Sequence, residues 1–150
     1  MTHLELKQNL VVECKKLQQK VIDNLKYEIT DIQQSANEYG QPKDRYDSYR
    51  MQLLRKKDMY SQQLSKAQNE IYALEKIDLE KECLVAEYGA VIITDDQKYF
   101  ISIGLGKIFF NEETYFAVSA LVPIAKALAG KRKDDFIEFN SKKIKIIEIF

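Results

Sequence analysis

Two carboxylates three residues apart, Asp44 and Asp47, are the side chains of this sequence best suited to chemistry. On a helix this spacing places both on one face, close enough to share an ion. Carboxylate oxygens suit Mg²⁺, which keeps several waters and usually takes only one or two protein ligands. A second Mg²⁺ beside an existing one can clamp a phosphate and activate a water. Because two acids alone bind Mg²⁺ weakly, we expect the ion to be held only where a partner supplies further ligands.

The same two residues also have a structural interpretation. Asp44 is a good N-cap for a helix that starts at this point, and Asp47 at the third helical position would then form a weak capping box. One carboxylate can serve as both a cap and a metal ligand, so both interpretations of Asp44 stay open.

Basic residues follow the acids on the same arm of the chain. As point charges or planar forks they can hold RNA phosphates. The alternative is the solvated face of a helix, on which charges are common. These residues are Arg45, Arg50, Arg55, Lys56 and Lys57.

Two long helices are predicted to position these side chains, one on each side of a break at Gly40 and Pro42. Apolar residues recur at helical spacing before and after the break. Two arms of similar length indicate an antiparallel coiled-coil hairpin over residues 1–80, with its tip near residues 40–47. The first stripe comprises Leu10, Cys14, Leu17, Val21, Leu25, Ile29, Ile32, Ala36 and Tyr39; the second comprises Leu53, Tyr60, Leu64, Ala67, Ile71 and Leu74, and Lys57 interrupts it.

The composition argues against some classes of function. Lys+Arg and Asp+Glu both number 23, so the net charge is zero. A balanced chain is poorly suited to bulk electrostatic binding of nucleic acid, although a small local basic patch is still compatible with it.

No apolar run approaches the roughly 20 residues that span a bilayer. Cys14 and Cys83 form no CxxC motif, which indicates reduced thiols in a cytoplasmic protein.

Beyond residue 84 the pattern changes to short segments rich in β-branched and aromatic residues, which predict strands. Residues 123–130 predict one short helix, with Pro123 near its first turn and Gly130 at its end. We therefore expect residues 84–150 to form a small α+β domain, a largely antiparallel sheet covered by that helix. The predicted strands are residues 90–94, 98–104, 107–110, 114–120, 135–140 and 142–150.

The stretch VSALVPIAKALAGKRKDD, from Val118 to Asp135, resembles the C-terminal domain of bacterial Gre transcript-cleavage factors, the family of GreA and GreB. The family pattern there is roughly I-S-x-x-S-P-I-G-R-A-L-L-G-K-x-x-G-D. The order of a helical hairpin before a small FKBP-like domain agrees as well. The direct matches are Pro123, Ile124, Ala127, Leu128, Gly130, Lys131 and Asp135, whereas Val122, Ala125, Ala129 and Asp134 replace Ser, Gly, Leu and Gly.

The tip resembles a divergent branch of that family, in which the corresponding stretch reads like G-D-K-H-E-T-x-R. The segment DRYDSYR, residues 44–50, fits this variant position by position and gives Asp44 and Asp47 the two acidic places. Aligning Gly40 with the family glycine would instead put Gln41 in the first acidic place and break the pair. We favour the first alignment because it preserves the chemistry.

The resemblance implies a monomeric transcription elongation factor that binds RNA polymerase, inserts its tip into the secondary channel and stimulates Mg²⁺-dependent cleavage of backtracked RNA. Asp44 and Asp47 would then be the catalytic and metal-binding acids, and the basic residues would contact RNA or the polymerase. The nascent RNA 3′ end would lie at the tip, and any contact with DNA would be indirect, through the polymerase. The polymerase, not this chain, would be the enzyme.

Other functions remain open. Aspartate in place of glutamate shortens the reach of the tip by one methylene, which is compatible with a channel-binding regulator or inhibitor that does not stimulate cleavage. A coiled-coil chaperone or adaptor is an alternative of another class, and it predicts exposed apolar residues at the hairpin end. A prolyl isomerase is disfavoured, because the chain has no Trp and no evident aromatic-lined pocket.

Overall fold

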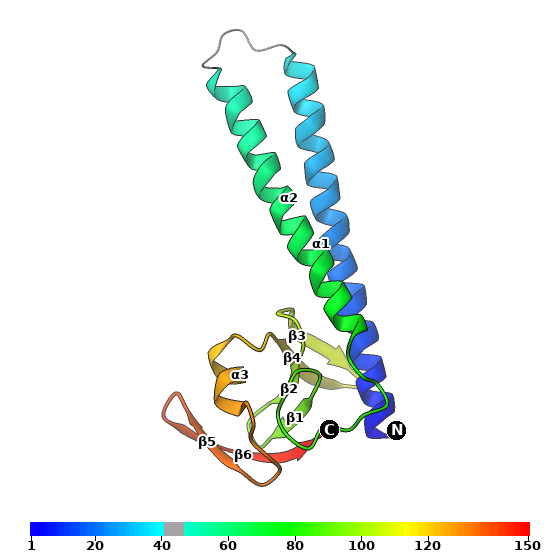
Figure 1. The fold of residues 1–150 in the computed structure, drawn as a ribbon, viewed down its shortest axis with the longest axis vertical. Helices are drawn as coiled ribbons and strands as arrows, with labels where there is room; N and C mark the ends of the chain where they lie inside the picture. The colour runs from blue at the N-terminus through cyan, green and yellow to red at the C-terminus, as the bar shows by residue number, and fades with distance from the viewer. Residues whose placement is uncertain (41–46) are drawn as a thin grey trace. The chain divides into compact units, whose positions relative to one another are not determined.

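A computed structural model of the chain describes residues 1–40 and 47–150 (Figure 1). Two long helices come first, α1 (His3–Tyr39) and α2 (Ser48–Glu75). The predicted α+β class, with a helical hairpin before a small sheet domain, is confirmed. The elements that follow are β1 (Val91–Thr94), β2 (Lys98–Ile101), β3 (Gly106–Phe110), β4 (Glu113–Val118), α3 (Pro123–Leu128), β5 (Phe136–Phe139) and β6 (Lys142–Ile149).

Internal contacts divide the chain into two compact units. One comprises Met1–Leu17 together with Tyr72–Phe150, and the other comprises Gln18–Ile71. The predicted division, 1–80 and 84–150, follows the change from helices to strands, whereas the contacts divide both helices. The reason is that Leu10 and Cys14 of α1 and Leu74 of α2 are buried in the core of the unit that contains the sheet.

The helical unit, Gln18–Ile71, is an antiparallel pair of helices that pack along one seam (Figure 1). The predicted stripe is displaced by one residue in part of α1: Val21 is 41% exposed, whereas Ile22 is only 4% exposed. Gln18 follows the buried Cys14 by four residues, so it lies on the seam, where its side chain is 3% exposed. Its Nε2 donates to the carbonyl of Ala67 at 3.0 Å and to Glu70 Oε2 at 3.3 Å. The buried amide is therefore satisfied, as a polar group in a helical seam must be.

The six strands form one sheet in the order β3-β4-β2-β1-β6-β5. Four of its neighbouring pairs are antiparallel, and β2 with β4 is the parallel one. β5 and β6 are joined by a tight turn at Asn140 and Ser141, whose φ angles of 51° and 62° suit a type I′ hairpin. The predicted strands 135–140 and 142–150 meet at this turn, whereas the parallel pair was not predicted.

The central strands, β1 and β2, are covered on both faces, since their alternate residues point to opposite sides and both sets are buried. Val91 and Phe100 pack with the first turns of α1 in one hydrophobic cluster. Ile92 and Ile101 pack on the other face with Leu128 of α3, which lies beside β5 in Figure 1. α3 therefore packs against one face of the sheet, and the first turns of α1 pack against the other.

Candidate functional site

The predicted tip begins where α1 ends. Gly40 follows the last helical residue, Tyr39, with a φ of +85°, and its N–H donates to the carbonyl of Ala36 at 3.2 Å. Glycine is favoured at this position because the left-handed conformation ends a helix. The carbonyl of Gly40 in turn accepts a hydrogen bond of 2.6 Å from Nη1 of Arg50. Arg50, predicted to contact RNA or polymerase, therefore ties together the two helix ends.

Asp47 is the N-cap of α2. Its Oδ1 accepts a hydrogen bond of 3.2 Å from the N–H of Arg50, and its carbonyl accepts one of 3.1 Å from the N–H of Met51. This is the usual geometry of a capping carboxylate. The cap was predicted at Asp44, three residues earlier, so the predicted start of the helix was too early. Asp44 itself lies outside the described residues.

Aromatic residues complete this end of the hairpin. The hydroxyl of Tyr39 donates to Asp47 Oδ1 at 3.1 Å, so this oxygen accepts hydrogen bonds from two of the described residues, Tyr39 and Arg50. The ring of Tyr39 also lies against the ring of Tyr49, with centroids 4.8 Å apart and an angle of 58° between the planes. The orientation of the Asp47 carboxylate is therefore fixed by the hairpin. Asp44 and Arg45 lie outside the described residues, so the predicted geometry of the acid pair stays a prediction.

The three remaining basic candidates differ in their surroundings. Lys57 is half-buried and its Nζ donates to Gln33 Oε1 of the opposite helix, so it helps to hold the seam. Arg55 and Lys56 are exposed. Among the described candidates, these two side chains form no hydrogen bond or ion pair with the hairpin, and they are the ones best placed to meet an anionic partner.

An apolar surface accompanies them on the first half of α2. Large apolar side chains are exposed there, and two of them, Tyr49 and Met59, line a groove of about 580 Å³. Exposed apolar groups of this size on neighbouring turns often mark a binding surface. This is the feature that the chaperone or adaptor alternative predicted. The exposed residues are Tyr49, Met51, Leu54 and Met59, and the groove is lined by Tyr49, Gln52, Leu53, Arg55, Lys56 and Met59.

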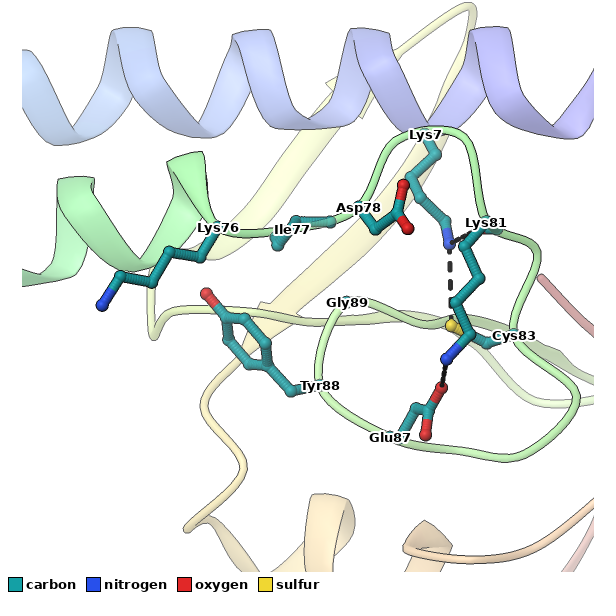
Figure 2. Close-up of a pocket in the computed structure, with 9 residues that line it drawn as sticks. All are labelled: Lys7, Lys76, Ile77, Asp78, Lys81, Cys83, Glu87, Tyr88 and Gly89. Carbon is teal, nitrogen blue, oxygen red and sulfur yellow. Dashed lines mark hydrogen bonds and ion pairs between the residues drawn. The ribbon is translucent and has the colours of Figure 1, made fainter.

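A second pocket, of about 340 Å³, lies in the unit that contains the sheet, and Figure 2 shows the residues that line it. Lys7 of α1 is fully buried, and its Nζ donates to the carbonyl of Lys81 at 3.1 Å and lies 3.8 Å from Cys83 Sγ. The Nζ of Lys81 pairs with Glu87 Oε1 at 3.1 Å. Sequence reasoning missed Lys7; the available signal was its place on the apolar stripe, three residues before Leu10.

The chemistry of this second pocket is structural. Burial raises the pKa of the Cys83 thiol, and the Lys7 ammonium only partly opposes that shift. The hydrogen bond from Lys81 holds the pKa of Glu87 below its usual value. A thiol that stays protonated is a poor nucleophile. The Cys83 thiol is therefore not activated, and the contacts of Lys7 tie the first turns of α1 to residues 81–83.

Within residues 1–40 and 47–150, no three His, Cys, Asp or Glu side chains converge closely enough to hold a metal ion. Over the same ranges, neither long helix has an apolar stretch of the length that a bilayer crossing requires.

The stretch that carries the family resemblance folds around α3. Val122 occupies the N-cap position without a side-chain cap, and Pro123 stands in the first turn. Gly130 and Asp134 both have positive φ angles, 76° and 71°. The family pattern has Ser at position 122 and Gly at positions 130 and 134. These are the residue types that an N-cap and a left-handed backbone favour, so the pattern agrees with the backbone even where this sequence departs from it.

No family model and no curated protein matches the sequence. Among solved structures, the crystal structure of GreA factor homolog 1 (Gfh1) of Thermus thermophilus is similar over 91% of this chain and 94% of its own, with 14% identity and a TM-score of 0.34. A structure of the transcription factor Gfh1 covers 90% of this chain and 92% of its own, with 14% identity and a TM-score of 0.33. Values this low establish neither a shared family nor a shared function.

Proposed function

We propose that the chain is a Gre-like transcription elongation factor that binds RNA polymerase, brings its hairpin tip into the secondary channel and stimulates cleavage of backtracked RNA. The observation that supports this best is the agreement between the family pattern and the backbone around α3. Val122 and Asp134 depart from the pattern, yet they stand at a helix N-cap and at a positive φ, where Ser and Gly are favoured. The order of hairpin and sheet domain supports the same conclusion.

In this proposal the chain completes an active site that belongs to the polymerase. Asp44 and Asp47 supply oxygens to a Mg²⁺ ion that the polymerase and the RNA also hold. Arg55 and Lys56, both exposed, contact RNA phosphates or the polymerase. The chain acts in the cytoplasm as an activator of the polymerase's own chemistry.

The test is an RNA cleavage assay on backtracked polymerase complexes from the same organism, in the presence of Mg²⁺. Wild type should shorten the transcript, whereas Asp44→Asn and Asp47→Asn should not, although both should still bind polymerase. Asparagine caps a helix about as well as aspartate, so Asp47→Asn removes the charge without removing the cap. Ser48→Ala, a change at an exposed neighbour, is the matched control and should cleave normally. Normal cleavage by both Asn variants would exclude the catalytic role.

A regulator that binds the channel without stimulating cleavage is the second candidate. The observation that favours it is the commitment of Asp47 Oδ1 to Tyr39 and to the N–H of Arg50, which leaves less of this carboxylate for a metal. In the same assay such a regulator should slow nucleotide addition and leave the transcript at full length, and Asp47→Asn should keep that inhibition.

An adaptor that holds client proteins is favoured by the exposed apolar side chains of α2. It predicts that Leu54→Ser and Met59→Ser abolish the binding of clients, and that Asp44→Asn has no effect. Retention of polymerase binding and cleavage by the two Ser variants would argue against this candidate.

A further inference from the structure

The outward face of the β5–β6 hairpin carries an aromatic ring among lysines. Ile137 and Ile144 point inward and are buried with α3. Strand alternation therefore puts Phe136, Lys143 and Lys145 on the opposite face, together with the exposed Glu138, which stands across from Lys143 but forms no ion pair with it within 4.0 Å. Phe136 is 51% exposed, and the Nζ atoms of Lys143 and Lys145 lie 4.3 Å and 5.9 Å from the centre of its ring. β5 is also an edge strand, so no further strand covers this side of the ring.

Positive charge is concentrated in the same part of the chain. Residues 131–145 contain six Lys or Arg and three Asp or Glu, which gives a net charge of +3 in a chain whose overall charge is zero. Two of these lysines are paired, Lys142 with Asp96 and Lys145 with Asp134. Among the described residues, no carboxylate lies within 4.0 Å of the other four cations, which are the exposed Lys131, Arg132, Lys133 and Lys143.

We propose that the outward face of the β5–β6 hairpin, formed by Phe136, Lys143 and Lys145, binds single-stranded nucleic acid, and that the exposed cations of the preceding loop, Lys131, Arg132 and Lys133, add positive charge close to it in the chain. Cations that track phosphates and an exposed aromatic side chain on which a base stacks are the two elements of such sites. In the free chain the Lys143 ammonium lies over the Phe136 ring. An incoming base takes its place on the ring, and the released ammonium contacts a phosphate.

Single strands fit this face better than the other polyanions. The bases of a duplex are stacked on each other and offer no open face to Phe136. An acidic protein segment would use the cations and leave the ring without a partner. The proposal does not depend on the proposed function, because the hairpin tip and the β5–β6 hairpin belong to different units of the chain.

The experiment is a fluorescence anisotropy titration of the full chain with labelled single-stranded RNA and DNA of mixed sequence, at about 50 and about 200 mM salt. Phe136→Leu removes the ring and keeps an apolar side chain, and Lys143→Gln removes one charge. Wild-type affinity should fall as salt rises. Phe136→Leu should weaken binding by about fivefold or more, the usual effect of losing one stacked base. Lys143→Gln should weaken binding and lower the salt slope by about one.

Two matched controls locate the effect. Lys107→Gln removes an exposed lysine from β3, the opposite edge of the sheet. Lys20→Gln removes an exposed cation from the helical unit, away from the residues proposed to contact RNA or polymerase. Both should bind as wild type does. In addition, oligonucleotide should shift the backbone amide resonances of wild-type β5 and β6, a measurement that does not depend on how any variant folds.

Several outcomes would overturn the proposal. The first is no binding at the lower salt concentration, and the second is equal affinity of Phe136→Leu and wild type. Amide shifts confined to α2 would move the site to the hairpin. Competition by an acidic peptide together with an unchanged Phe136→Leu affinity would identify an acidic protein partner instead. None of these results alters the outcome of the transcript cleavage assay, so failure of either proposal can be recognised separately.

Discussion

The hydroxyl of Tyr39, the last residue of α1, donates a hydrogen bond of 3.1 Å to Oδ1 of Asp47, the N-cap of α2. A second hydrogen bond runs in the opposite direction, from the guanidinium of Arg50 in α2 to the carbonyl of Gly40, which follows α1. Both contacts join the helix ends that flank residues 41–46. Asp47 therefore has a structural role as a cap, and substitutions can separate that role from the proposed metal binding.

Asp47→Ala should destabilise the first turn of α2, whereas Asp47→Asn should not. Alanine removes the acceptor of the Arg50 N–H, a loss that typically costs about 1 kcal/mol, but the asparagine oxygen replaces it. The measurement is hydrogen exchange at the Arg50 amide, which should accelerate by about fivefold in the Ala variant alone. Ser48→Ala is the control for a neighbouring change. Equal exchange in the Ala and Asn variants would show that the capping bond contributes nothing.

Gln18→Leu should leave the helical pair as stable as wild type or make it more stable. Leucine has a similar volume and removes a buried amide, and such exchanges are often neutral. Gln18→Ala should lower stability by roughly 1–3 kcal/mol because it leaves a cavity beside Ala67. Hydrogen exchange of the amides of residues 20–30 measures both effects. Gln19→Leu, at an exposed position, is the control. If the Leu variant is as unstable as the Ala variant, the amide contacts and not the volume stabilise the seam.

Lys7→Met and Lys7→Ala should differ in their effect on the free energy of unfolding. Methionine fills the space of the buried stem and removes an ammonium whose partners are the carbonyl of Lys81 and the thiol of Cys83. Stability should therefore be unchanged or higher. Alanine should cost about 2–4 kcal/mol through the cavity it leaves. Urea unfolding followed by circular dichroism measures both. Lys16→Ala, at an exposed residue paired with Glu13, should change little. Equal losses for Met and Ala would mean that the ammonium itself stabilises the fold.

Stability should fall at alkaline pH because of Cys14. Burial raises the pKa of this thiol from 9.0 to about 12. The folded chain therefore keeps a proton that the unfolded chain releases, so the contribution to stability is complete below pH 9 and is lost as pH rises toward 12. The loss is at most about 1.4 kcal/mol per pH unit.

The comparison that tests this is urea unfolding of wild type and Cys14→Ala from about pH 8 to about pH 11. Wild type should lose more stability over the interval. Cys83, whose pKa burial also raises, is present in both proteins and contributes equally. Parallel pH profiles would contradict the prediction.

Sequence reasoning was most accurate where the determinants are local. Gly40 ends α1 and Pro123 begins α3, because each residue favours one backbone conformation. It was least accurate on the seam of the helical pair. The predicted stripe included Val21 instead of the buried Ile22. The reason is that Gln18, the seam residue four positions before Ile22, is polar and is not recognised as part of an apolar stripe. The capping position was also misplaced, because Asp44 and Asp47 have equal intrinsic preference for it.

The sequence by itself determined the order of helices and strands, the breaks between them and the presence of two aspartates between two long helices. These features follow from periodicity and from residues with narrow backbone preferences. The tertiary structure decided that Lys7 is buried, that β2 pairs in parallel with β4, and that Phe136 lies among lysines on an open face. Such relationships join residues distant in the chain, and they depend on how whole elements pack, which no local pattern encodes.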